Sequence, residues 1–198
     1  KKILRTPFLA ALVAGGVVYG LARFVLPSQH VPEEFLGAHK KSAEIAGRIV
    51  HLSHENLAAF ERITEYDRAK NFSDALLLVS QRLIANREMQ QEAIRLSSQL
   101  ERMARLTSDI RPSRAREVAT EGVSAEVALV SRLVAYNDYL RQLFEVLLQR
   151  FEKPYEAWRE QDHVQVLISK INEETQAINN FNKRFVASMQ TLEGILAE

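Results

Sequence analysis

VQVLISKINEETQAINNFNKRFVASMQTLEGIL, residues 164–196, carries the most regular hydrophobic pattern in the chain. Mostly apolar positions recur along it at steps that alternate between four and three residues. Since an α-helix has about 3.6 residues per turn, such steps place the side chains on one face of a helix. A regular alternation is typical of long helices that pack at shallow angles. The stripe is Val164, Ile168, Ile171, Thr175, Ile178, Asn182, Phe185, Met189, Leu192 and Leu196.

The same pattern occurs in three stretches upstream. The first stripe is Phe35, Ala38, Ser42, Ile45, Ile49, Leu52, Asn56, Ala59, Ile63 and Tyr66. The second, on a helix expected over about residues 74–110, is Leu76, Val79, Leu83, Asn86, Gln90, Ala93, Ser97, Leu100 and Ala104. The third is Val123, Glu126, Val130, Leu133, Asn137, Leu140, Phe144, Leu147 and Phe151. Because no stretch shows the alternation of a β-strand, the sequence predicts an all-α fold.

Short connections separate the four predicted helices. Ser73 is the expected N-cap of the second helix, Pro112 the expected start of the third, and Pro154 interrupts the chain before the fourth. Helices joined by short loops lie antiparallel, so residues 33–198 are expected to form a long up-down four-helix bundle. Two long hairpins that do not close into one bundle are the alternative.

Composition limits the chemistry that the chain can perform. It has 198 residues, of which 46% are hydrophobic and 26% charged, as in a globular protein. Its formal net charge of +1 favours no nucleic-acid partner. The lack of cysteine excludes disulfides, thiolate metal sites and a cysteine nucleophile. Since no catalytic triad order or phosphate-binding glycine loop stands out, we expect a non-enzymatic protein without a cofactor.

An uncharged run, Thr6–Ala22, stands near the N-terminus. With its apolar neighbours it has about the length of a membrane-spanning helix. We therefore expect residues 1–26 to be an anchor that contacts lipid through residues 3–26, followed by a linker over residues 27–32. A signal peptide cleaved after Ala22 is the alternative. More cations precede the run than follow it, which favours a single-pass membrane protein with a cytoplasmic N-terminus and an extracytoplasmic bundle, periplasmic in a bacterium.

Gly16 and Gly20 form a G-x-x-x-G pair within this run. Small residues at this spacing let two membrane helices approach closely, because packing replaces the hydrophobic drive in lipid. The pair is therefore a candidate contact for a homodimer.

Polar residues interrupt all four stripes at about the same expected height. Folding the helices about their connections brings together Asn56, Asn86, Gln90, Asn137 and Thr175. One interpretation is a hydrogen-bonded layer that fixes the alignment of the helices. The other is a small polar ligand pocket in a sensor-like bundle.

The two ends of the predicted bundle differ in composition. The end next to the anchor collects cations that would lie near lipid headgroups, where each gains on the order of 1 kcal/mol at an anionic surface. These are Lys40, Lys41, Arg105, Arg111, Arg114 and Arg116. The far end collects aromatic residues that either contact a partner or cap the core of the bundle. These are Tyr66, Phe72, Tyr155 and Trp158.

Two histidine patterns are candidates for metal binding. His51 and His54 are three residues apart, but the helical phase places them away from the core. Glu160-x-x-His163 matches one half of a di-iron carboxylate site, which needs a second such motif. The leading hypothesis is therefore a membrane-anchored scaffold or accessory subunit with an unidentified protein partner. A ligand-sensing bundle and a metal-carboxylate enzyme are the alternatives.

Overall fold

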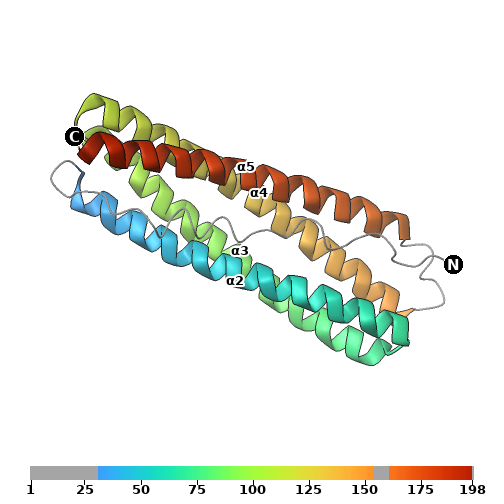
Figure 1. Ribbon diagram of the computed structural model, residues 1–198. Coiled ribbons are helices and arrows are strands. Elements are labelled where there is room, and N and C mark those ends of the chain that lie inside the picture. The colour runs from blue at the N-terminus through green and yellow to red at the C-terminus, as the bar shows by residue number, and fades with distance from the viewer. Residues whose placement is uncertain (1–30, 154–160, 198) are drawn as a thin grey trace.

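The computed structural model describes residues 31–153 and 161–197, which form long helices without strands. The elements are α2 (Glu33–Ala69), α3 (Phe72–Leu106), the short 3₁₀ helix η1 (Thr107–Asp109), α4 (Ser113–Glu152) and α5 (Gln161–Ala197). Figure 1 shows the four long helices lying lengthwise beside one another as a rod. The predicted all-α, up-down four-helix bundle is confirmed. At about 1.5 Å per residue, α2 and α5 are each about 55 Å long.

Several predicted features lie outside the described residues. They are the anchor with Gly16 and Gly20, the linker up to residue 30, and the loop that holds Tyr155, Trp158 and Glu160. Among the helices that the structure describes, none combines the length and the hydropathy needed to cross a membrane.

The structure confirms three of the four stripes. Every predicted stripe residue of α4 is buried, and those of α2 and α5 are buried except for the half-buried Leu52, Tyr66 and Ile168. Phe35, Phe144 and Phe185 have no exposed surface at all. Since burying a side chain of this size stabilises a fold by about 1.5–3 kcal/mol, the three aromatic rings anchor the core at different heights of the rod.

The stripe predicted for α3 is wrong at three positions in the C-terminal half of the helix, where Ala93 and Leu100 are buried as predicted. Its members Gln90, Ser97 and Ala104 are exposed, and the buried residues beside them are Met89, Leu96 and Met103. The helix takes a step of three residues after Asn86 where the prediction took four, so each of the three inward residues lies about 100° around the helix from the residue predicted in its place. The three longer apolar side chains bury more surface, and this determines the face. Gln90 therefore lies outside the polar core layer.

The turn between α2 and α3 also differs from the prediction. Lys70 adopts the left-handed conformation, with φ of 57°, and ends α2. Asn71, not Ser73, is the N-cap of α3, and its Oδ1 accepts a hydrogen bond of 3.4 Å from the backbone N–H of Asp74. Serine and asparagine are both good N-caps, so the residue type alone did not distinguish them.

The four helices are not packed equally. α4 packs closely against both α3 and α5, and α2 packs closely against α3. The backbones of α2 and α5, which are described along their whole length, make almost no close approach. Figure 1 shows the resulting arrangement, in which α4 lies with α5 and α2 lies with α3.

Gly122 permits the close packing of α4 against α5. A Cβ atom at this position would lie 2.6 Å from Met189 Cε and 3.2 Å from Ser188 Cβ. The methionine end can move, but Ser188 Cβ is fixed to the backbone of α5. A larger residue at position 122 therefore has to push the two helices apart.

We expect Gly122→Leu to lower the free energy of unfolding by about 1–3 kcal/mol, because overpacking a close interface strains it. Gly47→Leu is the matched control, since a Cβ there meets nothing within 4 Å. The control should gain about 0.5–1 kcal/mol from better helix propensity. Urea denaturation measures both variants. Equal effects at the two positions would contradict the close approach of α4 and α5.

Candidate functional site

Asn86 and Asn137 form a reciprocal pair in the middle of the bundle. Asn86 Nδ2 donates to the backbone oxygen of Asn137 at 3.0 Å, and Asn137 Nδ2 donates to the backbone oxygen of Asn86 at 3.2 Å. Both side chains are buried. Each bond runs from a side chain to the main chain of the other helix, so the pair ties α3 to α4 at one height.

The other members of the predicted polar layer do not join this pair. Thr175 Oγ1 donates to the backbone oxygen of Ile171 within α5, at 2.8 Å. Asn56 is 1% exposed, and neither its Nδ2 nor its Oδ1 has a hydrogen-bond partner among the described residues. The structure thus shows a bonded pair and a separate buried amide instead of one continuous layer.

A small cavity lies near this level. It has a volume of about 20 Å³ and touches all four helices. Its lining includes Val50 and Ser53 of α2, Tyr136 of α4, and Thr175 and Asn179 of α5. A space of this size holds about one water molecule, so it is too small for a metabolite in this conformation.

Glu126 is the most unusual polar residue of the interior. It is completely buried in α4, and both carboxyl oxygens lack a hydrogen-bond partner in the described part of the chain. Burial raises the pKa of Glu126 to about 8, so the carboxyl group is mostly protonated at neutral pH. A neutral carboxyl group is the only form that a site without a counter-charge tolerates.

His39 is a second buried titratable group in the same part of the bundle. Its ring stacks against Phe185, with 6.5 Å between the ring centroids. Phe185 also faces Gly122, and Gly122 lies one turn before Glu126 on α4. Burial lowers the pKa of His39 and keeps the imidazole neutral. Both groups therefore enter the core without charge.

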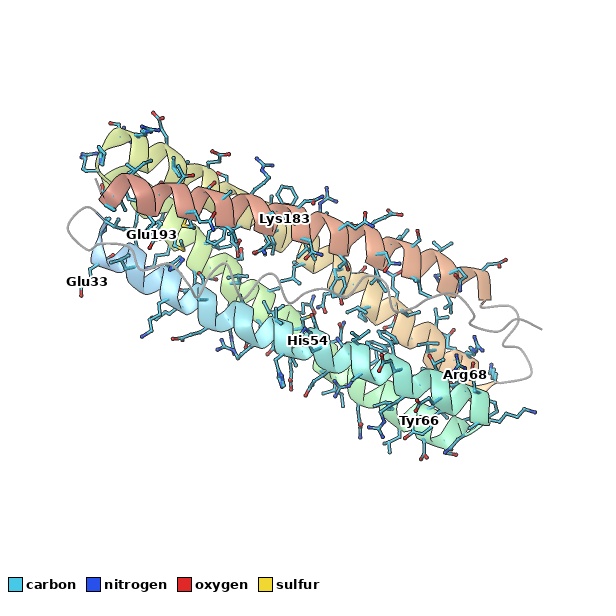
Figure 2. The ribbon with its side chains drawn as sticks, in the orientation of Figure 1. Glu33, His54, Tyr66, Arg68, Lys183 and Glu193 are labelled. Atoms are coloured by element: carbon cyan, nitrogen blue, oxygen red, sulfur yellow. The ribbon has the colours of Figure 1, made fainter. Side chains whose placement is uncertain are left out.

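The predicted basic residues do lie at one end of the bundle, where α2 begins and α3 meets α4. Figure 2 labels Glu33 and Glu193 at this end, so acidic side chains also lie there. Arg105 forms an ion pair with Glu101. The other five cations form no ion pair with a carboxylate of the described residues. Arg116 is half-buried, and the other four are exposed: Lys40, Lys41, Arg111 and Arg114.

The two described aromatic residues of the far end contact the bundle itself. Tyr66 is half-buried, and its hydroxyl accepts a hydrogen bond from Arg62 Nη2 at 3.0 Å. Phe72 stacks against Phe151, with 6.1 Å between the ring centroids. Figure 2 shows Tyr66 and Arg68 near the end of α2. Phe72 in particular covers the end of the core.

The histidines of the two candidate metal motifs lie on the outside, as the helical phase predicts for His51 and His54. The His51 side chain is 74% exposed and lies 3.5 Å from Glu55, and His54 and His163 are exposed. In residues 31–153 and 161–197, no group of three or more histidine, cysteine, aspartate or glutamate side chains could hold a metal ion.

Comparisons of the chain with protein-family models, with curated proteins and with solved structures find no match.

Sequence reasoning placed Glu126 on the inward stripe but did not single it out. The available signal was a carboxylate in a stripe whose other members, apart from Asn137, are apolar. Sequence reasoning missed His39 because this residue lies beside the stripe of α2. The residue becomes buried only when α2 and α5 lie in one bundle.

We expect Glu126→Gln to remove most of the pH dependence of stability between about pH 6.5 and 8, because the buried His39 contributes its own, opposite dependence only below this range. The pKa of about 8 in the folded state exceeds the ordinary value of 4.5, so the folded state holds one extra proton in this range. The free energy of unfolding then falls by about 1.4 kcal/mol for each unit that the pH rises. Urea denaturation at four pH values measures this slope. The exposed Glu121→Gln is the control and should keep the slope, and a Glu126→Gln slope equal to that of the unchanged protein would contradict the assignment.

Proposed function

We propose that the protein is a non-enzymatic helical bundle, held to a membrane by residues 3–26, that acts as a scaffold or accessory subunit through protein contacts. The observation that supports this proposal is the polarity of the rod. Residues 1–30 join α2 at the end that carries Lys40, Lys41, Arg111 and Arg114, all exposed and without an ion pair to a described carboxylate.

This end suits a surface next to anionic lipid. The Arg111–Arg116 stretch connects η1 to α4 and therefore lies at the height at which α2 begins. Cations held there gain on the order of 1 kcal/mol each from an anionic headgroup region. The acidic residues Glu33 and Glu34 reduce this gain, so the apolar run supplies most of the proposed attachment.

The interior of the bundle supports a role through contact. Large apolar side chains fill it, the Asn86–Asn137 amides bond to the backbone, and the cavity of about 20 Å³ has no room for a substrate. The rod carries its far end about 55 Å from the proposed membrane surface. We propose this far end, with Tyr155 and Trp158, as the contact for the partner, and the extracytoplasmic side as the location of the bundle.

A ligand-sensing bundle is the second candidate, and Asn56 favours it. Its buried amide has no partner among the described residues, and Ser53, one turn earlier on α2, lines the cavity. A ligand larger than water would have to separate α2 from α5 to reach it, which is the kind of movement that a sensor uses.

We expect the full chain, expressed in bacterial cells, to stay in the membrane pellet after a carbonate wash. In spheroplasts, protease added from outside should digest the bundle. A Leu12→Lys, Val17→Lys variant should leave the pellet, because each lysine costs about 2.5–3.5 kcal/mol at the centre of a bilayer. The control, Ser28→Lys with Gln29→Lys, adds the same charge outside the run and should stay. Release of the unchanged chain, or a mature N-terminus at Arg23, would contradict the anchor.

A further inference from the structure

The exposed apolar side chains of the bundle gather on two of its helices. Among the described residues, six large apolar side chains are at least 44% exposed, and five of these belong to α3 and α4. They are Leu77, Ile84, Ile94, Val127 and Val134. Single exposed apolar residues need no explanation, but a group of them is typical of a contact surface. A contact is therefore expected on α3 and α4.

An open pocket lies between α3 and α4 on the outer side of the bundle. It has a volume of about 210 Å³, and Ala104 lines it together with Thr120, Ser124 and Val127. In packed helices, residues seven positions apart share one face, so the flanks of the pocket continue along both helices at this spacing. We call the six exposed, uncharged residues of these flanks the outer strip: Gln90, Ser97, Ala104, Thr120, Val127 and Val134.

The outer strip accounts for the part of α3 where the predicted stripe was wrong. Gln90, Ser97 and Ala104 belong to the heptad-spaced stripe that was expected to face the core, yet all three are exposed. An uncharged heptad is typical of a helix that packs against another helix at a shallow angle. The flank of α3 beside the pocket is thus suited to a helix from outside the bundle.

The Asn86–Asn137 hydrogen bonds show which residues of the two helices lie level. α3 and α4 are antiparallel and rise equally, so a step forward from Asn86 matches a step back from Asn137. Ile94, one turn before Ser97, is therefore level with position 129, two residues after Val127. Ile94 is 61% exposed and Val127 is 46% exposed. At this level both helices present an apolar side chain to the outside.

Charged residues at the two ends of the outer strip are complementary between the helices. By the same alignment, Arg87 is level with position 136 of α4, two residues before Asp138. Arg105 is level with position 118, next to Glu117. Arg87 and Glu117 are exposed, and neither forms an ion pair with another described residue. At both ends α3 carries a cation where α4 carries an anion.

We infer that this face is an interface between two copies of the chain, which lie parallel with α3 of each copy over α4 of the other. A two-fold axis along the rods produces this arrangement and makes every contact twice. Ile94 of each copy then packs on Val127 of the other, and the cations at the ends of the strip approach the anions that are level with them. A surface pairs with itself in this way only if its two halves complement each other at every level.

Not every charge on this face is complementary. Glu101 is level with Glu121, which is a like charge, but Arg105 forms an ion pair with Glu101 and offsets it. Asp138 already accepts a hydrogen bond of 2.8 Å from Arg141 within its own copy. Since exposed ion pairs contribute little to stability, the charges select the alignment and the apolar contacts hold the copies together.

The parallel arrangement is favoured over an antiparallel one. An antiparallel pair centred on Ile94 places Val127 opposite Ser131 and Val134 opposite Ser124, so the valines lose their apolar partners. It also holds the N-termini of the two α2 helices at opposite ends of the pair, so one membrane cannot take both proposed anchors. This second argument rests on the proposed function.

The size of the interface also links it to the membrane. α3 rises about 21 Å from Arg87 to Glu101, and two helices side by side are about 20 Å wide, so the face offers roughly 400 Å². A standard interface buries about 800 Å² on each partner, so this face alone makes a weak dimer. Copies held in one membrane meet at a raised effective concentration, at which a small interface is sufficient.

Disulfides between copies test this interface, because the chain has no cysteine of its own. Two full-length chains with different tags, each carrying one introduced cysteine, are synthesised together in a cell-free system with phosphatidylcholine–phosphatidylglycerol vesicles and then oxidised. Ile94→Cys is combined with Val127→Cys. The matched control combines Ile94→Cys with Asn180→Cys, an exposed position of α5 at about the same height, because Ser188 adjoins Gly122. Circular dichroism checks that each variant keeps its helicity.

We expect the Ile94–Val127 combination to give linked heterodimers in a yield several-fold above that of the control. Gln90→Cys with Val134→Cys, which are also level, is the second test combination and should behave in the same way. Ile94→Cys in both chains should stay near the control yield, because the two residues lie on opposite sides of the two-fold axis. Adding Ile94→Arg to both chains should lower the Gln90–Val134 yield several-fold, whereas Asn180→Arg should leave it unchanged.

Equal yields for the test combinations and the control would overturn the interface, because the copies would then meet by chance or only through their anchors. A highest yield for Ile94→Cys in both chains would overturn the parallel alignment. Flotation of the vesicles separates this inference from the proposed function. Chains that float with the vesicles without links above the control retain the anchor and overturn the interface. Chains that link but do not float support the interface and overturn the anchor.

Discussion

The packing of α4 is the constraint on which the rest of the structure depends. α5 packs closely on it where Gly122 leaves room for Ser188, and α3 is tied to it by the reciprocal amides of Asn86 and Asn137. α2 reaches α4 through Phe60, whose ring stacks on Phe144 with 4.9 Å between the centroids. A partly buried ion pair of 2.9 Å between Asp67 and Arg150 joins the same two helices near the far end.

The polar groups of the interior divide into those that hold the helices and those that cost stability. Each amide of the Asn86–Asn137 pair donates one hydrogen bond to the backbone of the other helix, so the pair stabilises one alignment of α3 and α4, and the Oδ1 atoms of both residues have no partner among the described residues. Glu126 gains no partner among the described residues and enters the core only as a neutral acid. Residues that lower stability without a packing role are frequent at sites of function or movement, and Glu126 lies in the part of the bundle nearest to the proposed membrane surface.

Most of the architecture could be predicted from the spacing of apolar residues, because a stripe of nine or ten positions leaves one helical face to bury. The prediction failed where the stripe was ambiguous. In α3, Gln90 and Met89 are neighbours, and only the packing of Met89 against the other helices shows which of them faces inward. The cap of α3 was ambiguous for the same reason, since Asn71 and Ser73 are both good caps.

The candidate sites were less predictable than the fold. The sequence placed Asn56, Asn86 and Asn137 near one height, but hydrogen bonds to backbone oxygens depend on side-chain direction, which spacing does not contain. For Tyr66 and Phe72, composition predicted an aromatic end but could not distinguish a partner contact from a cap, and the stacking of Phe72 on Phe151 favours the cap.

Hydrogen exchange of the full chain tests the central place of α4 most directly. Amides in the middle of α4 have close neighbours on both sides, whereas those of α2 have one closely packed neighbour, α3. We therefore expect the central α4 amides to be protected at least roughly tenfold more strongly than those of α2, a difference of about 1.4 kcal/mol in opening free energy. Equal protection of α2 and α4, with the bundle opening as one unit, would contradict this account.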